Sequence, residues 1–113
     1  MHEAILSDRG FGDEINTLDL AKALIDEGFH PMTMYFPLVV HGAMLVEPTE
    51  TESKASLDQF IMALRSVAER ARAGDHSLKG APIYAPRRRL DETLAARKPV
   101  LVYRHPEPAQ AAE

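Results

Sequence analysis

Two stretches of the chain carry apolar residues at three- and four-residue steps, and this spacing predicts two amphipathic helices. The first follows a cap at Asn16 or Thr17 and ends at Gly28, because glycine readily adopts the left-handed conformation that stops a helix. The second has the clearer apolar stripe and ends at Gly74. Its stripe consists of Leu57, Phe60, Ile61, Leu64, Val67, Ala68 and Ala71.

Short runs rich in β-forming residues predict four strands around these helices. They cover residues 3–7, 32–36, 43–47 and 99–104. Pro37 and Pro48 close two of them, because proline has no amide hydrogen to donate to a sheet. Thr49 and Glu52 then have the spacing of a capping box, so the second helix is predicted to start there. Glu50 and Glu52 would place negative charge at its positive end.

The C-terminal third of the sequence has a less regular pattern. Residues 75–86 contain two prolines and several turn-forming residues, which is typical of an ordered surface loop. A short helix is predicted over residues 90–97, and residues 106–113 are predicted to form a flexible tail. Because no long linker divides the remainder, we expect residues 1–105 to form one domain.

Strands and helices alternate irregularly along the chain, with short connections in some places and long returns in others. This order favours an α+β fold in which a small mixed or antiparallel sheet is covered by two main helices. A doubly wound parallel sheet would need more crossover helices than 113 residues supply.

The composition, 45% hydrophobic and 27% charged, is that of a soluble globular protein. A net charge of -4 gives no basic footprint for nucleic acid, and no apolar run approaches the roughly 20 residues that span a bilayer. The N-terminus lacks the pattern of a signal peptide. Without cysteine, the chain can form neither disulfides nor a thiolate site. These features fit a cytoplasmic protein.

Residue spacing alone reveals no complete catalytic constellation. The five histidines lack the spacing of metal ligands, so no metal site is predicted. His30 is nevertheless a candidate pocket residue, because it stands between a helix stop and a proline. Residues 47–53 gather three carboxylates and three hydroxyls. A helix start explains most of these groups, whereas Glu47 and Thr49 are candidates to face a partner or a polar ligand.

Three consecutive arginines, at positions 87–89, precede the short helix predicted near the C-terminus. Their guanidinium groups could grip a carboxylate or a phosphate, although a solvated run of charge is the commoner arrangement. Positive charge at a helix start opposes the helix dipole. We therefore expect an acidic partner, at the site or between domains, for one of these arginines.

Several short motifs occur in one order along the chain. They are Thr17-Leu18-Asp19, Gly28-Phe29-His30-Pro31, Thr33-Met34-Tyr35-Phe36-Pro37-Leu38, the run from Met44 to Lys54, Arg89-Leu90-Asp91-Glu92, and the run from Ala96 to Leu101. In that order they resemble the C-terminal part of glycine dehydrogenase (decarboxylating), the P protein of the glycine cleavage system. The likeness covers residues 1–104 and is greatest to subunit 2 of the two-subunit form.

The resemblance implies a fold type I pyridoxal-phosphate enzyme, in which a large domain holds the cofactor on a lysine and a small C-terminal domain closes over the site. It implies oxidoreductase activity in glycine catabolism, with decarboxylation of glycine and transfer of the aminomethyl group to a lipoyl carrier protein. The expected partners are the large domain, subunit 1 and that carrier protein. The four lysines of this chain match no cofactor-lysine motif.

This chain would therefore be a small domain that lacks its large domain, inactive alone and without bound cofactor. Motif position also suggests which residues face the active site of the intact enzyme. They are His30, Thr33, Glu47, Thr49, Arg88 and Arg89. The alternative function is a non-catalytic assembly or binding module, which would self-associate through the surface that the large domain normally covers.

Overall fold

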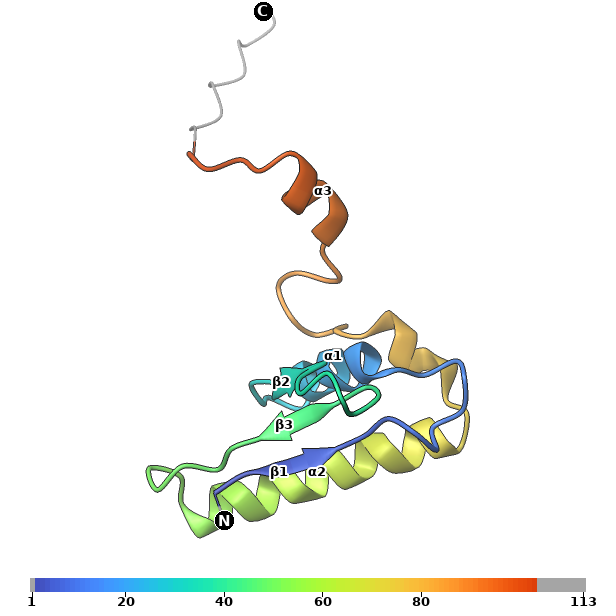
Figure 1. The fold of residues 1–113 in the computed structure, drawn as a ribbon, viewed down its shortest axis with the longest axis vertical. Coiled ribbons are helices and arrows are strands. Elements are labelled where there is room, and N and C mark those ends of the chain that lie inside the picture. The colour runs from blue at the N-terminus through green and yellow to red at the C-terminus, as the bar shows by residue number, and fades with distance from the viewer. Residues whose placement is uncertain (1, 104–113) are drawn as a thin grey trace, which may run out of the picture.

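A three-stranded antiparallel sheet lies beside two packed helices in the computed structural model, which describes residues 2–103 (Figure 1). The elements are β1 (Ala4–Leu6), α1 (Thr17–Asp26), β2 (Thr33–Met34), β3 (Met44–Val46), α2 (Lys54–Arg72), the 3-10 helix η1 (His76–Gly80) and α3 (Glu92–Arg97). The predicted α+β class and its small sheet with two main helices are confirmed. Within residues 2–103, no helix has the length and apolar character that crossing a membrane requires.

Strand β3 is the centre of the sheet and pairs with β1 on one side and β2 on the other. Leu45 stands opposite Ile5 in one pair and opposite Thr33 in the other. The strand predicted over residues 32–36 is shorter than expected. It ends at Met34, because the next residue, Tyr35, has a φ of 59°, which leaves the extended region and turns the chain into the loop before β3.

Helix α1 begins and ends as its sequence predicts. Of the two candidate caps, the structure uses Asn16, whose side chain accepts a hydrogen bond from the Asp19 amide at 3.1 Å. The Asp19 carboxylate accepts from the Asn16 amide in return, which completes a capping box. At the other end Gly28 has a φ of 86°, and the Phe29 amide donates to the Leu24 carbonyl at 3.0 Å. This is the Schellman stop expected at Gly28.

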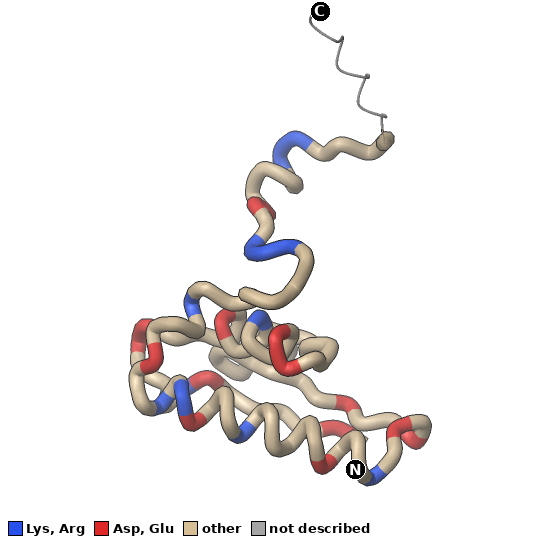
Figure 2. The backbone as a smooth tube through the Cα atoms, turned by 180° about the vertical axis from the view of Figure 1, so that it is seen from behind, with Lys and Arg blue, Asp and Glu red and all other residues tan. Residues whose placement is uncertain are grey.

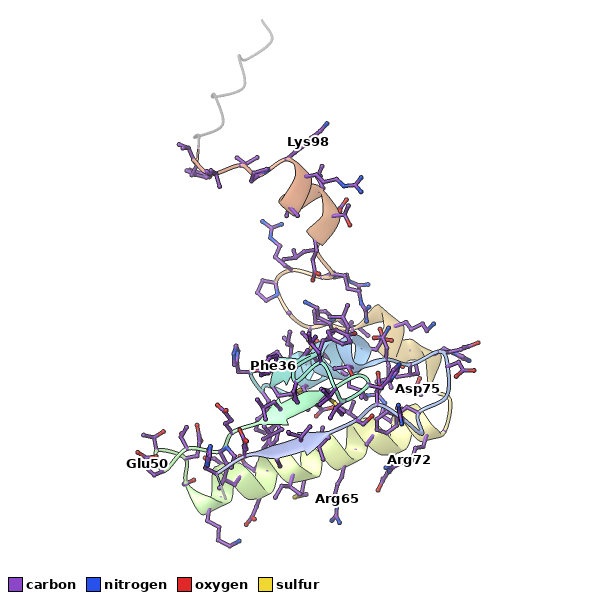
Figure 3. The ribbon with its side chains drawn as sticks, viewed as in Figure 1. Phe36, Glu50, Arg65, Arg72, Asp75 and Lys98 are labelled. Atoms are coloured by element: carbon purple, nitrogen blue, oxygen red, sulfur yellow. The ribbon has the colours of Figure 1, made fainter. Side chains whose placement is uncertain are left out.

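The predicted start of α2 at Thr49 and Glu52 is wrong. The helix begins at Lys54, after a cap at Ser53 whose hydroxyl accepts from the Ser56 amide. The Glu52 amide donates to the Thr49 carbonyl, which closes a separate turn ahead of the helix. Glu50 therefore projects from that turn, outside the first turn of α2 (Figure 3). The expected stop at Gly74 is confirmed by its φ of 74°.

The hydrophobic core lies where α1, α2 and η1 meet, and β3 contributes to it. Leu24 of α1 and Val67 of α2 are completely buried, and Met44 of β3 belongs to the same cluster. Leu78 of η1, within the loop predicted over residues 75–86, packs into the same cluster. Helix η1 thus lies inside that loop and makes it part of the core.

Residues 90–103 form an arm that leaves the body of the domain (Figure 1). It contains α3, which begins two residues later than the short helix predicted over residues 90–97. The strand predicted over residues 99–104 is wrong for the described residues 99–103, to which the structure assigns no strand. Residue 104 and the tail predicted over residues 106–113 lie outside the described residues.

Leu24→Ala should lower the free energy of unfolding by about 2–5 kcal/mol, because the change leaves a cavity in a fully buried position. Leu38→Ala makes the same chemical change at a side chain that is 87% exposed, and should cost less than about 0.5 kcal/mol. Urea unfolding of both variants measures the difference. Equal midpoints for the two variants would contradict the placement of the core.

Candidate functional site

A groove of about 450 Å³ runs between the sheet and the N-terminal half of α2. The chain after α1 forms one wall, the end of β3 and the following turn form another, and α2 closes the third. Its lining residues are Phe29, His30, Pro31, Met32, Thr33, Leu45, Val46, Glu47, Pro48, Thr49, Glu52, Ser56, Leu57 and Phe60. Three separate segments of the chain therefore build one concave surface.

Aromatic and aliphatic side chains form the apolar part of the groove. The rings of Phe29 and Phe60 pack edge to face, with centroids 5.5 Å apart and planes at 68°. The Schellman stop of α1 fixes Phe29 at the start of one wall, while Phe60 projects from the apolar stripe of α2. Such a packed aromatic pair holds its shape without a ligand, so this part of the groove is preformed.

Four of the six residues expected to face the active site line this groove. His30 and Thr33 come from the segment after α1, and Glu47 and Thr49 come from the end of β3 and the turn after it. The structure thus brings together two motifs that are 14 or more residues apart in the sequence. Their orientation toward an active site remains a prediction.

The two predicted arginines do not line the groove. Arg89 lies against α1 and η1, where its Nη2 is 2.6 Å from Oδ1 of the buried Asp19. It also donates to the carbonyl oxygens of Ala81 and Leu78, at 2.9 Å and 3.3 Å. One arginine therefore has an acidic partner, but the pair lies within this domain and away from the groove, whereas a pair at the site or between domains was expected. Arg88 is exposed to solvent.

The groove offers binding chemistry more clearly than catalytic chemistry. No lysine lines it, and Glu47 and Glu52 give its rim a negative charge that opposes a phosphate group. The groove by itself is therefore not suited to bind pyridoxal phosphate. Among residues 2–103, no cluster of three or more histidines and carboxylates could hold a metal ion. An apolar floor with polar groups at the edge instead suits a neighbouring protein surface or an organic ligand.

A second polar cluster, centred on Asp8, was not predicted from the sequence. The Asp8 carboxylate is buried, and its Oδ2 accepts from the Thr17 amide at 3.2 Å. The Thr17 hydroxyl lies 3.1 Å from the same oxygen and 2.7 Å from the Gly42 carbonyl oxygen. Nδ1 of His41 lies 2.9 Å from the other carboxylate oxygen. Asp8 precedes turn-forming residues in the sequence, and these predict a loop. They do not predict the hydrogen bonds that Asp8 makes with distant residues.

Hydrogen bonding decides the ionisation of Asp8. Burial alone would raise the pKa of its carboxyl, but hydrogen bonds from His41 and Thr17 together outweigh burial, so the pKa of Asp8 lies below its ordinary value of 3.8. The carboxylate is thus charged at neutral pH and fixes the His41 ring through Nδ1. The His41 side chain remains 69% exposed. The cluster therefore holds an exposed imidazole in one orientation.

Comparison with known proteins gives matches over most of the chain. A family model described as the C-terminal domain of glycine dehydrogenase matches residues 1–82. A probable glycine dehydrogenase (decarboxylating) subunit 2 from Caulobacter vibrioides is 69% identical over 103 residues, and one from Caldanaerobacter subterraneus subsp. tengcongensis is 51% identical over 104. Each match covers 89% of this chain, but only 20% and 21% of the respective relatives.

Two facts about extent follow from these matches. The chain spans about a fifth of the length of the curated relatives that it matches. In addition, a match that covers 89% of the 113 residues is longer than the family model's match, which ends at residue 82. The likeness to the relatives therefore continues into the arm.

Gly42→Ala should destabilise the domain more than Gly12→Ala does. Both glycines have positive φ, so each substitution should cost about 1–2 kcal/mol of backbone strain. A Cβ at position 42 would also collide with the Asp8 carboxylate, whereas a Cβ at position 12 meets no atom within 4 Å. Gly42→Ala should therefore lose about 1–3 kcal/mol more in urea unfolding. Equal losses would show that the carboxylate does not lie against Gly42.

Asp8→Asn should lower the free energy of unfolding at pH 7 by about 1–3 kcal/mol, because the buried hydrogen bonds lose a charged acceptor. The pKa of Asp8 is lowered in the folded state, so its contribution is fully present above pH 3.8 and is lost as pH falls through the folded pKa. The difference between the wild-type chain and the variant should therefore shrink below pH 4. Asp13→Asn, at an exposed carboxylate, is the control. A gap independent of pH would refute the ionised network.

Proposed function

Because this chain belongs to the family of glycine dehydrogenase C-terminal domains, we propose that it serves as the small domain of a glycine dehydrogenase (decarboxylating) subunit 2. In this role it contributes one wall of an active site whose other parts lie in the rest of the enzyme. The observation that carries the proposal is the groove, which unites the two family motifs around His30 and Glu47.

The division of labour follows from the chemistry of the groove. Pyridoxal phosphate, when bound to the enzyme, supplies the electron sink for decarboxylation of glycine. The residues of this chain do not suit the holding of that cofactor, so their contribution is to shape the site and exclude water. His30 and Thr33 on one wall, and Glu47 on the other, are the polar groups placed to orient a bound molecule.

In this role the chain would have the partners that the resemblance implies. They are the large domain, subunit 1 of the two-subunit enzyme and the lipoyl carrier protein of the glycine cleavage system, all in the cytoplasm. The alternative function, a module that self-associates without catalysis, is less well supported, because the relatives that match this chain bear the name of the enzyme subunit.

The isolated chain should show no saturable absorbance band when titrated with pyridoxal phosphate, because no lysine lines its groove. A chimera supplies the positive test. In it, this chain replaces the matching fifth of the relative from Caulobacter vibrioides, and subunit 1 from that organism is added. We expect the chimera to catalyse exchange of bicarbonate with the carboxyl group of glycine.

Two results would count against the proposed function. The first is stoichiometric, saturable binding of the cofactor to the 113-residue chain alone. The second is a chimera that folds and binds pyridoxal phosphate but does not exchange bicarbonate. Loss of folding in the chimera is monitored by circular dichroism, so that inactivity is not confused with misassembly.

A further inference from the structure

The arm of residues 90–103 exposes apolar side chains that a folded domain normally covers. Val100 and Leu101 are each 88% exposed and Val102 is 68% exposed. Leu90, just before α3, is 64% exposed, and Leu94, within α3, is 54% exposed. Consecutive apolar residues with this exposure are typical of a surface that is buried against a partner.

The base of the arm, in contrast, is fixed to the body. The Asp26 carboxylate accepts hydrogen bonds from the Ile83 and Tyr84 amides at 2.7–2.8 Å. Arg89 then ties the chain to Asp19 and to two carbonyl oxygens near η1. The arm thus leaves the domain from a defined point, and Figure 1 shows it directed away from the sheet and helices. A segment held at its base and exposed beyond it is placed to reach another polypeptide.

The chemistry of residues 100–102 favours pairing as a β-strand. Two of the three are β-branched, and all three are apolar, as in strands that are buried on both faces. The sequence predicts a strand here, yet residues 99–102 pair with no strand among the described residues. A strand needs a neighbouring edge to satisfy its backbone amides and carbonyls. The missing element is therefore the edge of a sheet outside residues 2–103.

The extent of the likeness to the relatives indicates which polypeptide supplies that edge, and the charge of the arm indicates the kind of surface that it would meet. Residues 87–103 carry five arginines and lysines against two acidic residues, whereas residues 2–86 carry seven against thirteen. Figure 2 marks the backbone positions of the basic residues in blue and of the acidic residues in red. A basic arm favours a surface that bears carboxylates. The arm also lies within the likeness to subunit 2 relatives, whose remaining four-fifths lies outside this chain.

We propose that residues 100–102 add as an edge strand to a sheet in the part of the glycine dehydrogenase subunit 2 polypeptide that lies outside this chain. The arm would then be a strap that fixes the small domain to the rest of the subunit. This inference rests on the proposed function, because it takes the rest of that subunit as the partner. Backbone hydrogen bonds would hold the strap, and its apolar side chains would be covered on both faces.

Amide hydrogen exchange at residues 100–102 tests the strap directly. We expect rapid exchange in the 113-residue chain and slowing by at least about tenfold in the chimera with the Caulobacter vibrioides relative. Two substitutions at one position separate backbone pairing from side-chain contact. Leu101→Pro removes an amide hydrogen and should abolish the slowing at its neighbours, whereas Leu101→Ala keeps the amide and should retain most of it.

Several outcomes would overturn the proposal. Rapid amide hydrogen exchange at residues 100–102 in an active chimera would show that these residues form no strand there. The proposed function would not be affected. Equal loss of protection in the two Leu101 variants would replace strand pairing with side-chain docking. Protection that appears in the isolated chain and rises with its concentration would assign the arm to a second copy. Protection in an inactive, folded chimera would support the strap and count against the proposed function alone.

Discussion

The buried carboxylate of Asp8 joins three segments that are far apart in the sequence. One carboxylate oxygen accepts a hydrogen bond from the amide of Thr17, the first residue of α1. The other oxygen contacts His41, in the loop before β3. The Thr17 hydroxyl extends the same contact to the Gly42 carbonyl oxygen. Because β1 ends just before Asp8, the arrangement of the sheet relative to α1 depends on this one group. The groove inherits that arrangement, since its walls come from the segment after α1 and from β3.

Local patterns in the sequence predicted the parts of the fold that local chemistry controls. The stop at Gly28 and the apolar stripe of α2 required only nearby residues, and both are confirmed, except that Ile61 of the stripe is 50% exposed. The start of α2 was wrong because two overlapping runs of hydroxyl and acidic residues offer alternative caps. Which cap is used depends on the turn that β3 leads into, and a sequence pattern does not contain that information.

Long-range contacts account for what the sequence could not predict. Asp8 and His41 are 33 residues apart, and neither belongs to a motif with recognisable spacing. Arg89 was expected to have an acidic partner, but that Asp19 would supply it follows only from the packing of η1 against α1. The groove was partly foreseen, because the family motifs named its polar residues before the structure placed four of them together. Residues 100–102 show the limit of local patterns, since a run of β-forming residues makes no strand without a neighbouring strand to pair with.

We propose that the groove of this domain forms one wall of the glycine-binding site in the complete enzyme. The chain has no cysteine, so Thr33→Cys places a single thiol on the groove wall and Ser66→Cys places one on an exposed part of α2. The rate of alkylation of each thiol in the chimera, followed by mass spectrometry with and without glycine, reports on that wall. We predict that glycine slows alkylation at position 33 and leaves position 66 unchanged. Equal rates at position 33 in the presence and absence of glycine would contradict the account.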